Sequence, residues 1–138
     1  MIVHHVGIVV ENIKDSMGIY QKIGYKLISE IIYDYSQNNK LVFLKEKNSK
    51  QVIELIEPID INSPVANKNN KGLHHICFEV DNLDDYIKNF EKLKIGKVFT
   101  KKIKAPAFDG REIVFCYLKD GNIVEILQKG DDINFKQT

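Results

Sequence analysis

Two histidines and two glutamates occupy matching places in the two halves of this 138-residue sequence. His5 and His75, each the second member of a His-His pair, lie 70 residues apart, and Glu54 and Glu125 lie 71 residues apart. Imidazole nitrogens and carboxylate oxygens are ligands of divalent first-row metals, and four of them leave places in the shell for water or substrate. The four residues therefore predict one metal centre, to which each half contributes a histidine and a glutamate.

Both glutamates lie in runs that are otherwise apolar. Glu54 is the centre of VIELI and Glu125 the centre of IVEIL, a pattern typical of strands that are buried on both faces. A buried carboxylate needs a partner, because it otherwise destabilises the fold or takes up a proton. Taken singly, each histidine could be a structural hydrogen-bonding residue and each glutamate could pair with Lys or Arg. Their matched placement favours the metal.

Four neighbouring residues are weaker candidates. Strand alternation turns His4 and His74 to the opposite face, which predicts surface residues or supports behind the ligands. Cys77 shares a face with His75 and could join a zinc site, although a packed free cysteine is the preferred interpretation. Glu79 shares that face too, either as a polar wall or second base of a cavity or as a strand end in solvent.

An internal repeat supplies the elements that must position these side chains. VHHVGIVVENIKDS (3–16) is repeated as LHHICFEVDNLDDY (73–86). In each copy a β-rich run precedes an asparagine that can cap a helix, and apolar residues three and four apart then form one helical stripe. The stripes are Ile13, Met17, Tyr20 and Ile23 in the first copy and Leu83, Ile87, Phe90 and Leu93 in the second. Gly24 and Gly96 fall near the two helix ends, where a left-handed residue is often needed.

Three strands are expected after each helix. They cover residues 25–32, 40–46 and 51–58 in the first half and 97–103, 111–118 and 122–128 in the second. The KDGN sequence at 119–122 predicts a tight hairpin. The expected fold is α+β, with two βαβββ modules that form curled mixed sheets around the metal site. We expect a single domain over 1–138, with module 1 at about 2–57, a polar linker at 58–72 and module 2 at about 73–128.

Charge and composition exclude several classes of partner. The chain has 20 basic and 19 acidic residues, which argues against nucleic acid and against anionic membranes. It contains no apolar run of membrane-spanning length, and we expect no signal peptide. Two cysteines suit reduced thiols, so we expect a cytoplasmic protein. The basic run at 101–104 is expected to be a solvated face, with contact to an anionic small molecule as the alternative.

These motifs identify the chain as similar to the vicinal oxygen chelate superfamily over about residues 2–128. The stretch that contains IELIEP, SPVA and GLHHI is especially similar to methylmalonyl-CoA epimerases. The resemblance implies a divalent ion (Co, Ni, Mn or Zn) at His5, Glu54, His75 and Glu125. It also implies a small-molecule thioester substrate and a homodimer.

The resemblance implies an isomerase or lyase that moves the proton next to a carbonyl, with Glu125 and Glu54 as acid-base groups. Bacterial glyoxalase I, a lactoylglutathione lyase that acts on a hemithioacetal, resembles the chain in the same ligand order. Val9 stands where glutathione-using relatives have Arg, which argues against glutathione. A drug-sequestering protein of the bleomycin-resistance type is a further alternative, although four complete ligands favour an enzyme. The APAFDG turn at 105–110 and the short hairpin depart from the epimerases, and we expect both at the substrate entrance.

Overall fold

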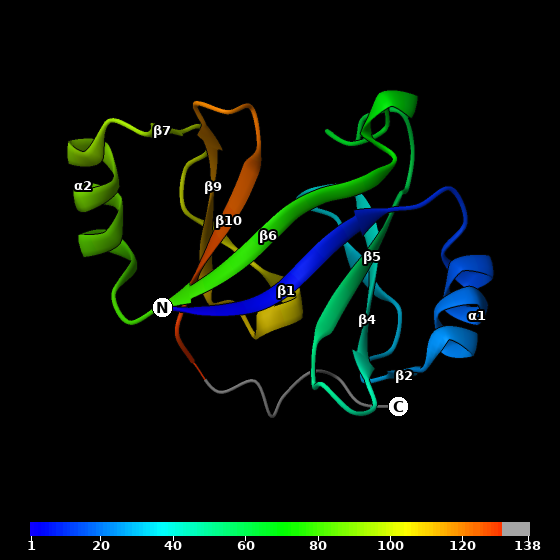
Figure 1. The fold of residues 1–138 in the computed structure, drawn as a ribbon. Coiled ribbons are helices and arrows are strands. Elements are labelled where there is room, and N and C mark those ends of the chain that lie inside the picture. Colours follow the sequence, from blue (N-terminus) through cyan, green and yellow to red (C-terminus); the bar gives the residue numbers. More distant parts are fainter. Residues whose placement is uncertain (131–138) are drawn as a thin grey trace.

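The computed structural model describes residues 1–130 of the chain, where two helices flank one extended sheet (Figure 1). The strands are β1 (Ile2–Val9), β2 (Tyr25–Leu27), β3 (Ile32–Asp34), β4 (Asn39–Glu46), β5 (Val52–Pro58), β6 (Gly72–Val80), β7 (Gly96–Val98), β8 (Ile103–Lys104), β9 (Glu112–Leu118) and β10 (Ile123–Gln128). The helices are α1 (Ile13–Ile23) and α2 (Leu83–Leu93), with short 3-10 helices η1 (Lys68–Asn70) and η2 (Pro106–Phe108). No helix within residues 1–130 is long and apolar enough to cross a membrane.

The strand order is symmetric about its centre, so that each strand of the first half has its counterpart at the same distance from the centre in the second half. It runs β2-β4-β5-β1-β6-β10-β9-β7, with β3 paired to β4 and β8 paired to β9. β1 and β6 are antiparallel to each other, and each is parallel to its outer neighbour, β5 or β10. A pseudo-twofold axis therefore passes between β1 and β6, at the centre of Figure 1, and relates α1 to α2. The predicted α+β fold of two similar modules on a curled mixed sheet is confirmed.

The first strand expected after each helix is broken in two. β2 and β3 replace it in the first half, and β7 and β8 replace it in the second. A side-chain hydroxyl takes the place of a ladder carbonyl at each break: Ser29 Oγ accepts from the Phe43 amide at 2.9 Å, and Thr100 Oγ1 accepts from the Phe115 amide at 3.0 Å. The expectation of one continuous strand was wrong because these hydroxyls satisfy the backbone where the strand leaves the ladder.

Both helices begin where the sequence predicts. Asn12 Oδ1 accepts from the Asp15 amide and Asn82 Oδ1 from the Asp85 amide, each at 3.0 Å. The apolar stripes pack against the sheet near the helix starts, but their last members lie in solvent, with Ile23 and Leu93 about two-thirds exposed. The stripe prediction was therefore wrong for the last residue of each stripe.

The two helix ends differ, although the sequence places a glycine near both. Gly24 has φ 131° and caps α1, with its amide donating to carbonyls of the last turn. In α2 the left-handed residue is Lys94, with φ 55°. Gly96 lies inside β7, where a Cβ would be 1.9 Å from the carbonyl oxygen of Tyr117. The prediction for Gly96 was wrong: this glycine allows close approach of two strands and does not end the helix.

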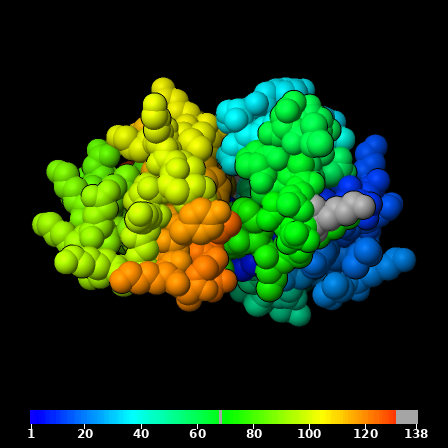
Figure 2. All heavy atoms as spheres, turned by 90° about the horizontal axis from the view of Figure 1, so that it is seen from above, coloured from blue at the N-terminus to red at the C-terminus, as the bar shows by residue number. Residues whose placement is uncertain are grey.

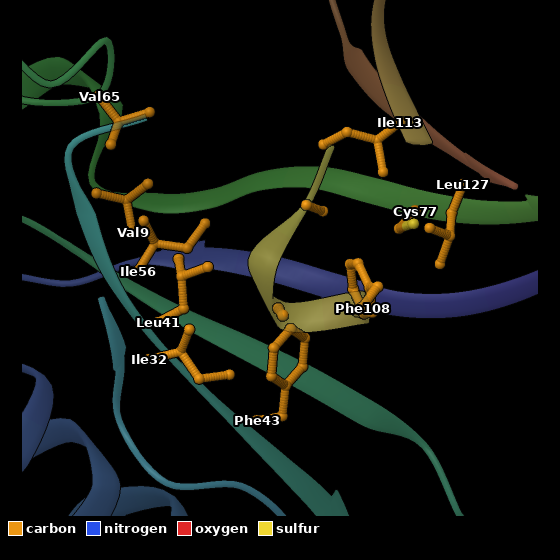
Figure 3. Packing of buried hydrophobic residues seen from close by; sticks show 12 residues of the cluster. Val9, Ile32, Leu41, Phe43, Ile56, Val65, Cys77, Phe108, Ile113 and Leu127 are labelled. Carbon is orange, nitrogen blue, oxygen red and sulfur yellow. The ribbon is translucent and has the colours of Figure 1, made fainter. Parts of the chain in front are cut away.

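The segment between β5 and β6 packs into the protein. Ser63 is buried and donates a 2.5 Å hydrogen bond to Asn39 Oδ1. Val65 is also buried and joins the apolar cluster of Val9, Leu41 and Ile56 shown in Figure 3. The expected linker is therefore more than a polar connection, because it covers one end of the central core.

Candidate metal centre

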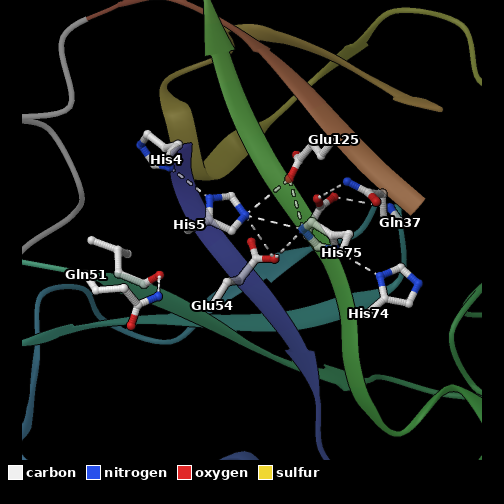
Figure 4. Close-up of polar contacts among 10 residues, drawn as sticks. His4, His5, Gln37, Gln51, Glu54, His74, His75 and Glu125 are labelled. Atoms are coloured by element: carbon white, nitrogen blue, oxygen red, sulfur yellow. Dashed lines mark hydrogen bonds and ion pairs between the residues drawn. The ribbon is translucent and has the colours of Figure 1, made fainter. Parts of the chain in front are cut away.

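The four predicted ligands come together on the four central strands (Figure 4). The Nε2 atoms of His5 and His75 lie 3.3 Å apart. Glu125 Oε1 lies 3.2 Å from the first of these atoms and 3.0 Å from the second. Glu54 Oε1 lies 3.7 and 3.6 Å from the same two atoms. All four side chains are buried, so four polar groups face one small interior volume.

Strand register explains why the glutamates occupy equivalent places. The parallel pairing of β1 with β5 sets Glu54 beside Gly7, two residues after His5. The parallel pairing of β6 with β10 sets Glu125 beside Cys77, two residues after the second ligand histidine. The same offset recurs in both modules. Strand pairing therefore places one histidine and one glutamate from each module near the pseudo-twofold axis.

A β-bulge places each outer histidine beside an inner one. In the β1–β6 ladder, Val3 and His5 pair with adjacent residues of β6, so His4 has no partner of its own. His74 is the corresponding extra residue on β6. A bulge breaks the alternation of side chains between faces. The expectation that alternation turns His4 and His74 to the opposite face was wrong for this reason.

Each outer histidine hydrogen-bonds to the inner one. His4 Nδ1 lies 2.8 Å from His5 Nδ1, and His74 Nδ1 lies 2.8 Å from His75 Nδ1. The contact holds the Nδ1 side of each inner ring and leaves its Nε2 turned toward the glutamates (Figure 4). The outer histidines therefore support the predicted ligands from behind, which was one of the two roles expected for them.

Burial and close charges set the protonation of the site. Burial lowers the pKa of His5 to about 4, so its ring is neutral near neutral pH. Burial, together with the negative charge of Glu125, raises the pKa of Glu54. Burial would also raise the pKa of Glu125, but the imidazoles of His5 and His75 hold it below its usual range. The protein surroundings thus give the two glutamates opposite tendencies to carry a proton.

The residues fit a divalent cation. Two ligand atoms bound at about 2.1 Å and separated by a normal coordination angle lie roughly 3.0–3.4 Å apart. The two imidazole nitrogens and Glu125 Oε1 have separations of 3.0–3.3 Å, and Glu54 Oε1 lies slightly farther out. Within residues 1–130, Glu125 Oε1 is a buried oxygen that makes no hydrogen bond. A bound cation would supply the partner that this oxygen lacks.

A cavity of about 400 Å³ opens onto three of these side chains, Glu54, His75 and Glu125. Its walls come from both modules, and the segments that form them meet along the seam between the two halves in Figure 2. Its lining includes five residues with amide side chains (Gln37, Asn38, Asn39, Asn62 and Asn70) and three aromatic residues (Phe99, Phe115 and Tyr117). A small molecule in this cavity would therefore reach the glutamates directly.

Comparison with known proteins assigns the family. Residues 4–115 match the model of the Glyoxalase/Bleomycin resistance protein/Dioxygenase superfamily. The chain belongs to this superfamily. It is 32% identical over 131 residues to a mitochondrial methylmalonyl-CoA epimerase of Homo sapiens, covering 91% of this chain and 72% of the relative. The mitochondrial methylmalonyl-CoA epimerase of Dictyostelium discoideum is 34% identical over 134 residues, with 91% and 77% covered.

Solved structures share the fold. A hypothetical protein from Bacillus halodurans superposes with a TM-score of 0.82 at 26% identity, covering 94% of this chain and 95% of that one. The methylmalonyl-CoA epimerase of Mycobacterium tuberculosis superposes with a TM-score of 0.80 at 22% identity, covering 95% and 89%. At that identity the second likeness concerns the fold.

Cys77 and Glu79 are the two remaining candidates from the sequence, and the Cys77 thiol lies beside the His4 and His5 rings. Burial raises the pKa of the Cys77 thiol well above its usual value, and this free cysteine packs in the core near His5. Glu79 accepts a hydrogen bond from Arg111 Nη1 at 3.2 Å and does not line the cavity. Of the two alternatives expected for Glu79, a cavity wall or second base and a strand end in solvent, neither describes this mostly buried carboxylate, which pairs with Arg111.

The APAFDG turn also lies away from the cavity. Residues 105–110 contribute nothing to its lining, so the cavity does not support their expected place at the substrate entrance. Phe108 of η2 packs instead against two of the clustered histidines, edge-on to His4 at 5.1 Å and stacked on His5 at 5.9 Å. Sequence reasoning missed Phe108, and the apolar centre of an otherwise turn-like segment was the signal that could have indicated it.

The basic run lies on the surface, as the preferred interpretation expects. Lys101, Lys102 and Lys104 are exposed. Lys102 Nζ pairs with Asp84 at 3.0 Å and approaches Glu112 at 4.0 Å. None of the three lysines lines the cavity.

Proposed function

We propose that this superfamily member is a divalent-metal-dependent enzyme that moves the proton next to the carbonyl of a CoA thioester, as a methylmalonyl-CoA epimerase. The observation that carries the proposal is the convergence of His5, His75, Glu54 and Glu125, the last three of which line a cavity. The curated methylmalonyl-CoA epimerases at 32% and 34% identity support the choice of substrate.

The four convergent residues would hold the ion. A bound divalent cation would polarise the substrate carbonyl and stabilise the negative charge that develops when the neighbouring proton leaves. The chain itself orients the inner imidazoles through the outer histidines and keeps the site buried at the end of the cavity. Burial strengthens the electrostatic interactions in the site because few waters compete there.

Glu54 and Glu125 are the proposed acid-base groups. Epimerisation requires a proton acceptor on one face of a planar intermediate and a proton donor on the other. The two glutamates come from β5 and β10, on opposite sides of the β1–β6 pair, and both line the cavity. They could therefore approach a substrate from its two faces. Within the described residues, the cavity lining holds no third carboxylate that could serve instead.

Metal content tests the first half of the proposal. Protein purified without added metal and then titrated with Zn²⁺, Co²⁺, Ni²⁺ or Mn²⁺ should bind one ion per chain. His75→Ala should lose most of this ion but keep a folded circular-dichroism spectrum. Full metal content in a folded His75→Ala protein would contradict the proposed ligands.

Proton exchange tests the second half. In deuterated water the metal-loaded protein should introduce deuterium at the α-carbon of methylmalonyl-CoA. Formation of a lactoyl-thiol from methylglyoxal and a thiol, without that exchange, would favour the glyoxalase alternative. Tight binding of bleomycin with neither reaction would favour a drug-sequestering protein.

The proposed assembly is a homodimer, because short curled sheets leave edges that a second copy can cover. Sedimentation of the full chain would reveal a monomer if this assembly is wrong.

A further inference from the structure

We propose that His74 donates a hydrogen bond from Nε2 to the substrate, and that metal binding at His75 sets the tautomer that makes it a donor. This inference rests on the proposed metal-dependent function. It adds to that function a residue that recognises an oxygen acceptor on the substrate, such as a carbonyl or carboxylate group.

The direction of the hydrogen bond between the two rings follows from the metal site. A ring nitrogen that binds a cation carries no proton, and a neutral imidazole has a single N–H. If His75 Nε2 binds the ion, the proton of that ring must be on Nδ1. The 2.8 Å contact then runs from His75 Nδ1–H to His74 Nδ1, which accepts. The one proton of His74 is therefore on Nε2.

The second nitrogen of His74 is available to a ligand. His74 is half-buried and lines the cavity together with His75 and Glu125. Within residues 1–130, its Nδ1 bonds to the neighbouring ring and no hydrogen bond is made by its Nε2. A donor fixed beside the metal site favours a substrate oxygen at that position and disfavours a substrate N–H there.

The pseudo-twofold mate provides a matched control. His4 makes the same 2.8 Å contact with its inner histidine, so it supports the ion in an equivalent way. Its ring packs edge-on against Phe108 at 5.1 Å and does not line the cavity. The two outer histidines therefore have one role in common, the support of a ligand, and only His74 is placed to contact the substrate.

Histidine tautomers on the zinc-loaded chain test the inference without any assay of activity. In the full chain with ¹⁵N-labelled histidine and one equivalent of Zn²⁺, two-bond ¹H–¹⁵N spectra should show His74 as the Nε2–H tautomer. The Nδ1–H tautomer, or a doubly protonated ring at neutral pH, would overturn the proposal. Failure to bind Zn²⁺ is detected earlier, in the titration itself, and would overturn the metal-dependent function and this inference together.

Steady-state kinetics distinguish contact of His74 with the substrate from its support of the ligand His75. Asparagine can keep an acceptor near the Nδ1 position and lacks the distal donor, so His74→Asn should retain zinc affinity. At saturating metal its KM for methylmalonyl-CoA should rise about tenfold, the factor expected for one lost hydrogen bond. His4→Asn removes only the support of an inner histidine, so its KM should rise less than that of His74→Asn. An unchanged KM in His74→Asn, or an equal rise in both variants, would show that His74 does not contact the substrate.

Discussion

Gly7 lies opposite His75 across the antiparallel β1–β6 pair, and the ring of that histidine occupies the space where a side chain at position 7 would be. An ideal Cβ on Gly7 would be 2.2 Å from His75 Cε1. The equivalent position in the other module holds Cys77, which lies opposite His5. The pseudo-twofold is therefore broken at this point, and only one of the two inner histidines needs a glycine opposite it.

Gly7→Ala should displace the ring of His75 and weaken metal binding. Misplacing one ligand should lower zinc affinity by about 10- to 100-fold, the scale found for disturbed metal ligands. Calorimetric titration measures the loss. Gly18→Ala is the matched control, because a Cβ there meets nothing within 4 Å. Equal affinity in the two variants would mean that the ring has room to move without cost.

Metal affinity should fall as the pH is lowered, with Glu54 as the main cause. Burial and the charge of Glu125 raise the pKa of Glu54, so its carboxyl holds a proton to a higher pH than usual. A cation must displace that proton, and affinity is therefore lost as the pH drops through the raised pKa. His5, with its pKa lowered to about 4, is already neutral near neutral pH and releases none.

Proton release on metal binding measures this effect. Calorimetry in buffers of different ionisation enthalpy should show proton release by the unaltered chain, and more of it as the pH is lowered. Glu54→Gln should release fewer protons. Identical release in both proteins would assign the displaced proton to another group.

Glu125→Gln should slow the exchange of the α-proton by about 10²-fold or more, the usual scale for the loss of a general base. Because this residue is also a proposed ligand, the rate must be measured at saturating metal with metal content verified. Glu112→Gln changes a carboxylate that is partly exposed on β9 and does not line the cavity, so it serves as the control. Unimpaired exchange by a metal-loaded Glu125→Gln protein would move the base to Glu54.

Gly96→Ala and Lys94→Gly should change stability in opposite directions. A Cβ at Gly96 would be 1.9 Å from the Tyr117 carbonyl oxygen, so β7 must separate from β9 at a cost of about 2–4 kcal/mol. Lys94 has φ 55°, and glycine should relieve that conformation by up to about 1 kcal/mol. Urea unfolding of the metal-free chain measures both. A stable Gly96→Ala protein would show that the two strands tolerate a wider spacing.

Sequence reasoning predicted that the four proposed ligands converge because the signal for them is local and occurs twice. His5, Glu54, His75 and Glu125 recur at repeat-equivalent positions, and each glutamate interrupts an apolar strand. The helix caps at Asn12 and Asn82 were visible for the same reason, since a cap depends on a few neighbouring residues.

Several of the errors concern features that depend on the pairing of two strands. The bulges that turn His4 and His74 toward the inner rings are defined by the pairing of β1 with β6, and a single strand carries no sign of them. Gly96 was predicted to end a helix because it follows one in the sequence. The contact that requires a glycine there is with Tyr117, more than 20 residues away, and local sequence gives no sign of it. Long-range spacing of this kind cannot be deduced from periodicity alone.

The seam between β1 and β6 also has an implication for how such a protein could arise. Each module contributes one imidazole and one carboxylate, and the axis between the modules relates the two pairs. A half-length ancestor with one histidine and one glutamate would have built the same four-residue site by self-association about a true twofold. Duplication and fusion of that ancestral gene would then have freed the two halves to diverge, so that one strand could acquire a glycine and the other a cysteine at the same position without loss of the shared site.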